Sequence, residues 1–130
     1  MKRLSLIALL FAFVPALSWA DVPSPLEREV QIGLSGVYVP SGFTAASDVY
    51  VVVNGIFQNG CYRWKKAEVK HRDTFVHEIE SFAAVSPGMC IMVLVPFQKE
   101  IPLGKLAAGT HTLRFENGDG TYLEKSLVIR

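Results

Sequence analysis

Short stretches of β-branched and aromatic residues, separated by turn residues, make up most of the chain after residue 28. Residues 30–34 and 110–116 alternate apolar and polar side chains, which is typical of a strand with one exposed face. Residues 49–53 and 90–96 are apolar on both faces, as in a central strand. The pattern therefore predicts at least two core strands among several half-exposed ones.

Turn residues divide these stretches into hairpins. Residues 61–69 are expected to pair with 74–82 across the turn 70–73, and 110–116 with 122–129 across a turn that holds Gly118 and Gly120. Residues 101–104 contain a proline and are expected to form an irregular piece at a sheet edge. Seven or eight short strands predict an immunoglobulin-like antiparallel β-sandwich over residues 29–130, with a small β-barrel as the alternative.

Residues 1–20 have a different character. Lys2 and Arg3 precede an apolar run over residues 4–14, and Ser18 and Ala20 stand at the third-last and last positions of the segment. This arrangement predicts a signal peptide cleaved after Ala20, with an apolar run too short to span a bilayer comfortably. We expect an exported protein, periplasmic or secreted and soluble, with a flexible arm over residues 21–28 and no transmembrane segment in the mature chain.

Charge argues against two classes of partner. The chain of 130 residues is 50% hydrophobic, but the leader holds a disproportionate part of that share. The formal net charge is +1, from 13 basic and 12 acidic residues, and loss of Lys2 and Arg3 makes it −1 (11 minus 12). Such a near-neutral chain has no field to recruit nucleic acid or an anionic membrane as its main partner.

Cys61 and Cys90 are the only cysteines. An exported chain meets an oxidising compartment, so the pair is expected to form a disulfide that contributes about 3 to 4 kcal/mol. A metal site or a reactive thiol has no support, because there is no Cys-x-x-Cys spacing and no third cysteine.

The C-terminal half carries a further pattern, in which Cys90 and Pro96-Phe97 are followed by Leu106-x-x-Gly109-x-His111. These residues resemble small exported bacterial immunoglobulin-like domains, in which Leu-x-x-Gly-x-Tyr opens the penultimate strand. The resemblance implies a tyrosine-corner device, with the ring packed inward and its polar end bonded to the preceding loop. Here a histidine stands in the tyrosine's place.

The hairpin that follows Cys61 is the candidate contact surface, because aromatic residues and arginine dominate binding hot spots. Its members are Tyr62, Arg63, Trp64, Lys65, Lys70 and Arg72. Two alternatives stay open: the aromatic pair packs against the disulfide, or the basic residues form an ordinary solvated hairpin neutralised by nearby glutamates.

Metal and cofactor chemistry have weak candidates. His71, His77 and His111 fall on a predicted turn, a strand and an inward face, and the run from His77 lacks the second histidine of a zinc-protease motif. Met89 and Met92 beside Cys90 could serve copper, but Met92 shares a strand face with Cys90 and Leu94, which favours a core strand. Calcium at the 116–119 turn would lack carboxylates. No metal or other cofactor is expected.

Catalysis has no candidate, because the chain lacks a nucleophile motif, a free cysteine and a phosphate-binding loop. We therefore expect a non-enzymatic exported interaction module that binds another protein or an envelope component. The alternatives are a small-ligand or copper/zinc carrier using His71, His77, Met89 or Met92, and a protease-inhibitor-like module presenting residues 43–46 or 86–88.

Overall fold

The computed structural model describes residues 26–130, and all its regular elements are β-strands. The predicted signal peptide and most of the predicted arm lie outside the described residues. The strands are β1 (Arg28–Ile32), β2 (Gly36–Tyr38), β3 (Val49–Phe57), β4 (Tyr62–His71), β5 (Val76–Val85), β6 (Val95–Gly104), β7 (Gly109–Glu116) and β8 (Tyr122–Ile129). Within the described part of the chain, no helix is long and apolar enough to cross a membrane.

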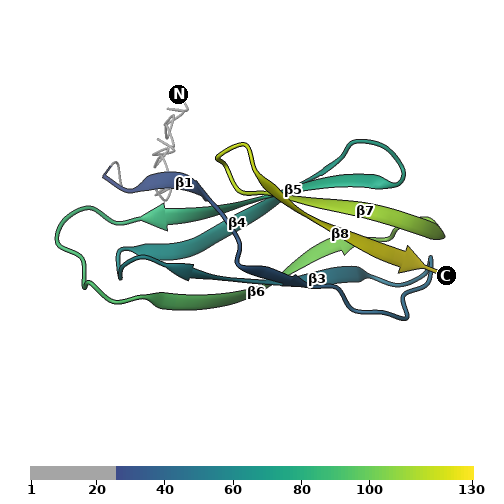
Figure 1. Ribbon diagram of the computed structural model, residues 1–130, viewed down its shortest axis with the longest axis horizontal. Helices are drawn as coiled ribbons and strands as arrows, with labels where there is room; N and C mark the ends of the chain where they lie inside the picture. The colour runs from purple at the N-terminus through teal and green to yellow at the C-terminus, as the bar shows by residue number, and fades with distance from the viewer. Residues whose placement is uncertain (1–25) are drawn as a thin grey trace, which may run out of the picture.

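The strands form two sheets that face each other in an elongated sandwich (Figure 1). The larger sheet is built around β5, which pairs with β4 along one edge. Its other edge is shared, because β7 pairs with residues 76–80 of β5 and β1 pairs with residues 81–85. β8 then extends the sheet beyond β7, while β3 forms the centre of the smaller sheet between β2 and β6. The predicted β-sandwich is confirmed, and two separate sheets exclude one closed sheet.

One strand pair departs from the antiparallel arrangement expected from the sequence. β5 and β7 run parallel, and all other pairs are antiparallel. The intervening strand β6 crosses to the smaller sheet, so the chain returns to the larger sheet in the direction that β5 already has. This crossover places the start of β7 beside the start of β5.

The core lies between the sheets and is made by every second residue of β3, β5, β7 and the C-terminal parts of β6 and β8. Val51, Leu113 and Phe115 are inaccessible to solvent. The predicted alternation of residues 110–116 is confirmed, because His111, Leu113 and Phe115 are buried while the residues between them are partly exposed. Both predicted hairpins are also confirmed, as β4–β5 and β7–β8.

The prediction of a core strand over residues 90–96 is wrong. Residues 86–94 form a loop, β6 starts at Val95, and the apolar side chains of the loop are exposed. The Cys61–Cys90 disulfide and a hydrogen bond from Gly60 N to Ile91 O (2.9 Å) hold the loop against the end of the sandwich, outside the ladder. An apolar run alone cannot distinguish a buried segment from an exposed one.

Residues 101–104 were expected to be irregular, but they are the last part of β6. The edge position is confirmed, because β6 pairs only with β3 and can therefore accommodate Pro102. The pairing shifts register between Val49 and Tyr50, opposite this part of β6. Ile101 and Leu103 point into the core.

Candidate functional site

One end of the sandwich carries a loop of exposed apolar side chains, residues 86–94, between β5 and β6. The exposed fractions are 102% for Met89, 72% for Ile91, 81% for Met92, 51% for Val93 and 71% for Leu94. The chain has no charged residue between Glu80 and Lys99. Isolated apolar side chains are common on protein surfaces, whereas a contiguous exposed group of them marks an interaction site or an aggregation liability.

Covalent and backbone bonds hold this loop, named here the apolar loop, in place. The predicted disulfide between Cys61 and Cys90 is confirmed, with a Cα–Cα distance of 5.2 Å. Ser86 N donates to Cys61 O (3.0 Å), and Gly60 N donates to Ile91 O (2.9 Å). The loop is thus fastened at its beginning and its middle, so that presenting its side chains to a partner requires little ordering.

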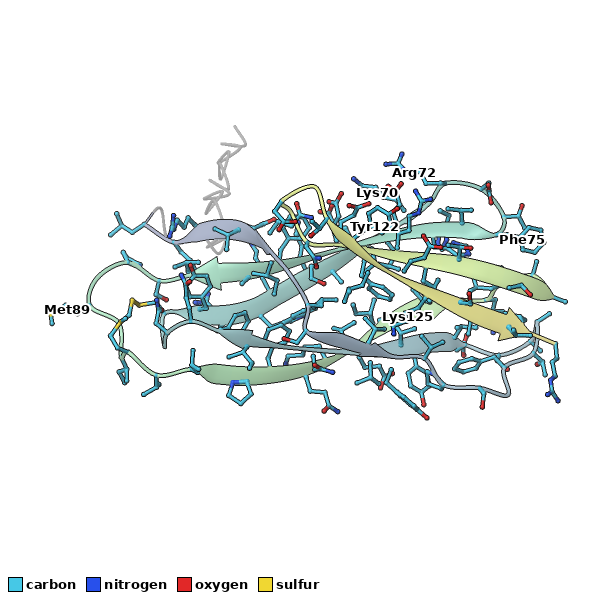
Figure 2. All side chains as sticks on the ribbon, in the orientation of Figure 1. Lys70, Arg72, Phe75, Met89, Tyr122 and Lys125 are labelled. Carbon is cyan, nitrogen blue, oxygen red and sulfur yellow. A yellow bond between two sulfur atoms is a disulfide. The ribbon has the colours of Figure 1, made fainter. Side chains whose placement is uncertain are left out.

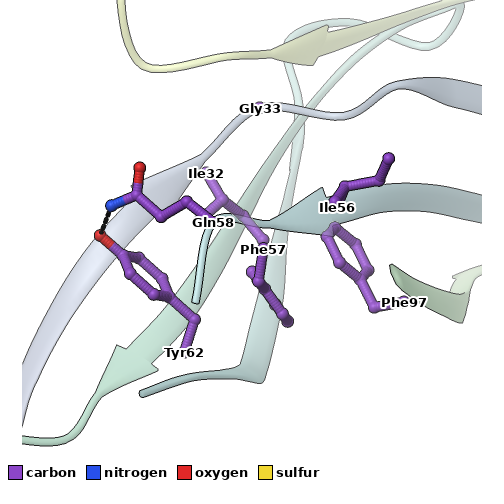
Figure 3. A pocket seen from close by; sticks show the side chains of 7 residues that line it. All are labelled: Ile32, Gly33, Ile56, Phe57, Gln58, Tyr62 and Phe97. Carbon is purple, nitrogen blue, oxygen red and sulfur yellow. Dashed lines mark hydrogen bonds between the residues drawn. The ribbon is translucent and has the colours of Figure 1, made fainter. Parts of the chain in front are cut away.

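Aromatic side chains of β3, β4 and β6 pack together, and Figure 3 shows Phe57, Tyr62 and Phe97 among them. Phe57 stacks on Phe97 with ring centroids 4.4 Å apart and on Tyr62 at 5.9 Å, and Gln58 Nε2 donates to the Tyr62 hydroxyl oxygen (2.7 Å). These side chains line a cavity of about 170 Å³. A second depression of about 340 Å³ shares Gln58 and Tyr62 and reaches the loop at Cys90. The disulfide end therefore combines projecting apolar side chains with adjoining hollows.

The six residues predicted as a contact surface do not form one continuous surface. Tyr62 and Trp64 are half-buried, and the Trp64 ring packs against the core and lies 5.7 Å from the Phe97 ring. Arg63 and Lys65 alternate with them, and each of the four basic residues pairs with a glutamate. These pairs are Arg63 with Glu27, Lys65 with Glu29 (2.7 Å), Lys70 with Glu80 (3.1 Å) and Arg72 with Glu78 (2.8 Å).

Electrostatics agree with this pairing. A hydrogen bond from Lys65 holds the pKa of Glu29 below its ordinary value, and hydrogen bonds to Glu68 and Glu29 raise the pKa of Lys66. These groups are exposed, so the pairs add little stability. Their effect is to leave β4 without a strong net field toward an acidic partner.

The three histidines, which the sequence distributes over separate elements, meet in a single row. His71 Nδ1 lies 2.6 Å from His77 Nδ1, and His77 Nε2 lies 2.8 Å from His111 Nδ1. His111 Nε2 donates to Ala107 O (2.7 Å), because a carbonyl oxygen can only accept. The row runs from exposed His71 to His77 and His111, which are buried.

The weak metal candidates are not brought together. Met89 and Met92 lie in the apolar loop, whereas His71 and His77 lie at the other end of β4 and β5; Figure 2 shows Met89 and Phe75 at opposite ends of the molecule. A ten-residue strand such as β5 separates the two groups by about 33 Å. Among residues 26–130, no three His, Cys, Asp or Glu side chains converge as a metal site would require.

The 116–119 turn has the geometry of a plain hairpin turn. Asp119 accepts hydrogen bonds from the Thr121 backbone nitrogen (2.9 Å) and from its hydroxyl group. These bonds, with the hydroxyl bond first, lower the pKa of Asp119. Its carboxylate is thus committed to closing the turn.

Sequence reasoning missed both the exposure of the apolar loop and the histidine row. The β4–β5 register places His71 opposite His77, and a hairpin turn placed after His71 instead of over residues 70–73 would have indicated this pair. The third member could not be found in this way, since the parallel pairing of β5 with β7 depends on the crossover of β6. The loop had a weaker signal in Pro87-Gly88, which interrupts the strand pattern directly before the apolar run.

Comparison with known proteins yields one finding. The family model of the ORF11 beta-sandwich domain matches residues 51–127, which is more than half of the chain. The search of the curated proteins and the search of the solved structures found no significant match to this chain. The matched region extends from β3 to β8 and includes the disulfide, the apolar loop and the histidine row. The chain therefore belongs to the ORF11 beta-sandwich domain family.

Proposed function

We propose that this protein is a non-enzymatic, exported interaction module, and that the apolar loop inserts into an apolar groove of another protein. The observation that carries the proposal is the exposure of Met89, Ile91, Met92, Val93 and Leu94 on a loop held by a disulfide. Full burial of one such side chain contributes about 1.5–3 kcal/mol. Burial of two or three of them contributes about 3–9 kcal/mol, so contacts in the adjoining hollows are also needed to offset an association cost of about 4–15 kcal/mol.

A protein groove accounts for the composition of the loop better than a lipid surface does. Segments that insert at a membrane interface usually combine apolar residues with aromatic residues and with lysine or arginine near the head groups. The apolar loop contains neither an aromatic nor a basic residue. Its two methionines, by contrast, suit apolar grooves, because their flexible, polarisable side chains adapt to irregular surfaces.

Export is supported by two independent features. The leader over residues 1–20 has the pattern of a signal peptide, and the disulfide is compatible with an oxidising compartment. An immunoglobulin-like type of sandwich is part of the same proposal. It draws support from the corner formed by His111 and Ala107.

Site-specific crosslinking tests the proposal and captures the partner in the same step. A photoreactive residue is placed at Met92, and at Val128 on β8 as an equally apolar, exposed control (57%). Both variants are produced in the cells that naturally make the protein. We expect a protein adduct from position 92 only, and a partner that then binds the purified chain directly.

Substitution measures the contribution of the loop to that binding. Replacing Ile91 and Met92 together by aspartate should weaken binding at least a hundredfold, or about 3 kcal/mol, whereas Val128→Asp should leave it unchanged. Equal loss in both variants would contradict the proposal. So would an adduct with lipid alone accompanied by binding to phosphatidylcholine/phosphatidylglycerol vesicles, or an adduct only with a second copy of the chain.

A further inference from the structure

The histidine row limits how many protons the folded protein can hold. The chain has three histidines, all in the row, and each imidazole has two ring nitrogens. Five of these nitrogens face one of three short contacts: His71 to His77, His77 to His111, and His111 to Ala107 O. Only the outer nitrogen of His71, Nε2, faces none of them.

Each contact can contain one hydrogen atom and no more. Two N–H groups pointed at each other across 2.6 or 2.8 Å would repel, and the hydrogen bond would be lost. Three neutral imidazoles supply three hydrogens, which fill the three contacts with donors all pointing toward Ala107. A fourth hydrogen fits only at His71 Nε2, so the intact row holds at most one excess proton.

We propose that this row is a pH-sensitive lock between β4, β5 and β7, which stays closed with one excess proton and is opened by a second. The excess proton can reside on any of the three rings, because a shift of hydrogens along the contacts moves it inward from His71. A second excess proton puts two N–H groups into one contact. Acid therefore breaks a hydrogen bond at the start of β5 and β7, in the core of the sandwich.

Two charged side chains, one acidic and one basic, lie near the outer end of the row. Asp73, in the β4–β5 turn, raises the proton affinity of His77 by its charge. Lys105, in the β6–β7 loop, lines the same depression as His71 and Asp73 and pairs with Asp48 (2.9 Å). On the inner side, Leu127 of β8 stands opposite His111, and the Phe75 ring packs against His111 at 5.1 Å.

Burial acts in the same direction as the hydrogen count. It lowers the pKa of His77 below the ordinary value of 6.5, and the nearby His71 and His111 lower it further. A histidine with a lowered pKa stabilises the fold above pH 6.5, and this stability is lost as the pH falls below 6.5 and the unfolded chain takes up the proton. At about pH 5 the unfolded chain holds nearly three excess protons and the intact row at most one.

Denaturant unfolding between about pH 5 and 7 tests the lock, because the unfolding constant reports the difference in bound protons. Near pH 5 we expect this constant to rise at least about a hundredfold for each unit by which the pH is lowered. His71→Gln removes one proton from the unfolded chain and leaves room for one in the row, so its unfolding constant should still rise at least about tenfold for each unit by which the pH is lowered. His71 is exposed, and this variant should fold.

Arg72→Gln is the matched control, because Arg72 neighbours His71, is exposed and pairs with Glu78 outside the row. Its pH dependence in this range should equal that of the unchanged protein. Imidazole NMR signals of the folded, unchanged protein at about pH 5 should account for one excess proton in total. Two imidazolium rings in the folded state, or a rise of less than about tenfold per pH unit in His71→Gln, would overturn the proposal.

Discussion

His111 donates a hydrogen bond from Nε2 to the carbonyl oxygen of Ala107 at 2.7 Å, four residues earlier in the chain. The ring is inaccessible to solvent, and its polar end returns to the loop that precedes β7. This is the geometry implied by the Leu106-x-x-Gly109-x-His111 pattern, with an imidazole in place of a phenol. A phenol has a single polar atom, whereas the imidazole has two ring nitrogens. The second one, Nδ1 of His111, forms the hydrogen bond with His77.

Gly109 is required in this corner for two reasons that substitution can separate. Its φ is +138°, and a Cβ atom there would lie 2.7 Å from the Phe75 ring. Gly104 has a φ of +78° but open space around a Cβ. We expect Gly104→Ala to cost about 1 kcal/mol of the free energy of unfolding and Gly109→Ala clearly more. Urea unfolding compares the two variants. Equal losses in the free energy of unfolding would show that the Phe75 ring moves aside without cost.

Loss of the His111 ring should be costly at neutral pH. His111→Phe leaves the Ala107 carbonyl and the His77 Nε2 group without their partner in a buried place, which costs about 2–5 kcal/mol in total. His71→Gln, at the exposed end of the same row, should cost less than about 1 kcal/mol. Urea unfolding at about pH 7.5, where the histidines of the unfolded chain are neutral, measures both. A small loss for His111→Phe would mean that water or a rearranged loop replaces the bonds.

Ser81 offers a stabilising substitution. Its side chain is 1% exposed, and its hydroxyl oxygen has no hydrogen-bond partner among the described residues. Removing a buried hydroxyl group without a partner avoids its desolvation cost, so Ser81→Ala should raise the free energy of unfolding by about 1 kcal/mol. Thermal unfolding checks this value. Ser86→Ala, at a partly exposed position beyond the same strand, should produce no comparable gain.

Loss of the disulfide should affect both stability and the apolar loop. Replacing Cys61 and Cys90 by alanine removes a link across 29 positions and should lower the free energy of unfolding by about 3 to 4 kcal/mol. Hydrogen exchange at the Ile91–Gly60 contact should accelerate in the double variant, while the β7–β8 ladder exchanges at rates set by the lower overall stability. The reduced wild-type protein should show the same faster exchange. If the Ile91–Gly60 contact stayed protected from exchange in either form, the disulfide would not be what holds the loop in place.

The local pattern of apolar, polar and turn residues was sufficient to predict the two hairpins and the inward face of β7. The alternation of residues 110–116 can only be satisfied by one buried face, and turn residues on each side set the ends of the strands. The same reasoning misplaced residues 90–96, because hydrophobicity favours burial only where the fold leaves space. Here the packed rings of Phe57, Phe97 and Trp64 occupy the interior of that end of the sandwich, and the disulfide holds the loop outside it.

The sequence by itself determined the class of fold and the pairing of its only two cysteines, since these depend on neighbours along the chain or on a unique partner, and the resemblance to immunoglobulin-like domains implied the corner at His111. The tertiary structure alone decided which apolar residues remain exposed and that all three histidines form one row. Both outcomes depend on the crossover of β6, which places β7 parallel to β5 and leaves residues 86–94 to bridge the two sheets. Contacts between segments so distant in the chain are set by packing, and short-range periodicity carries no information about them.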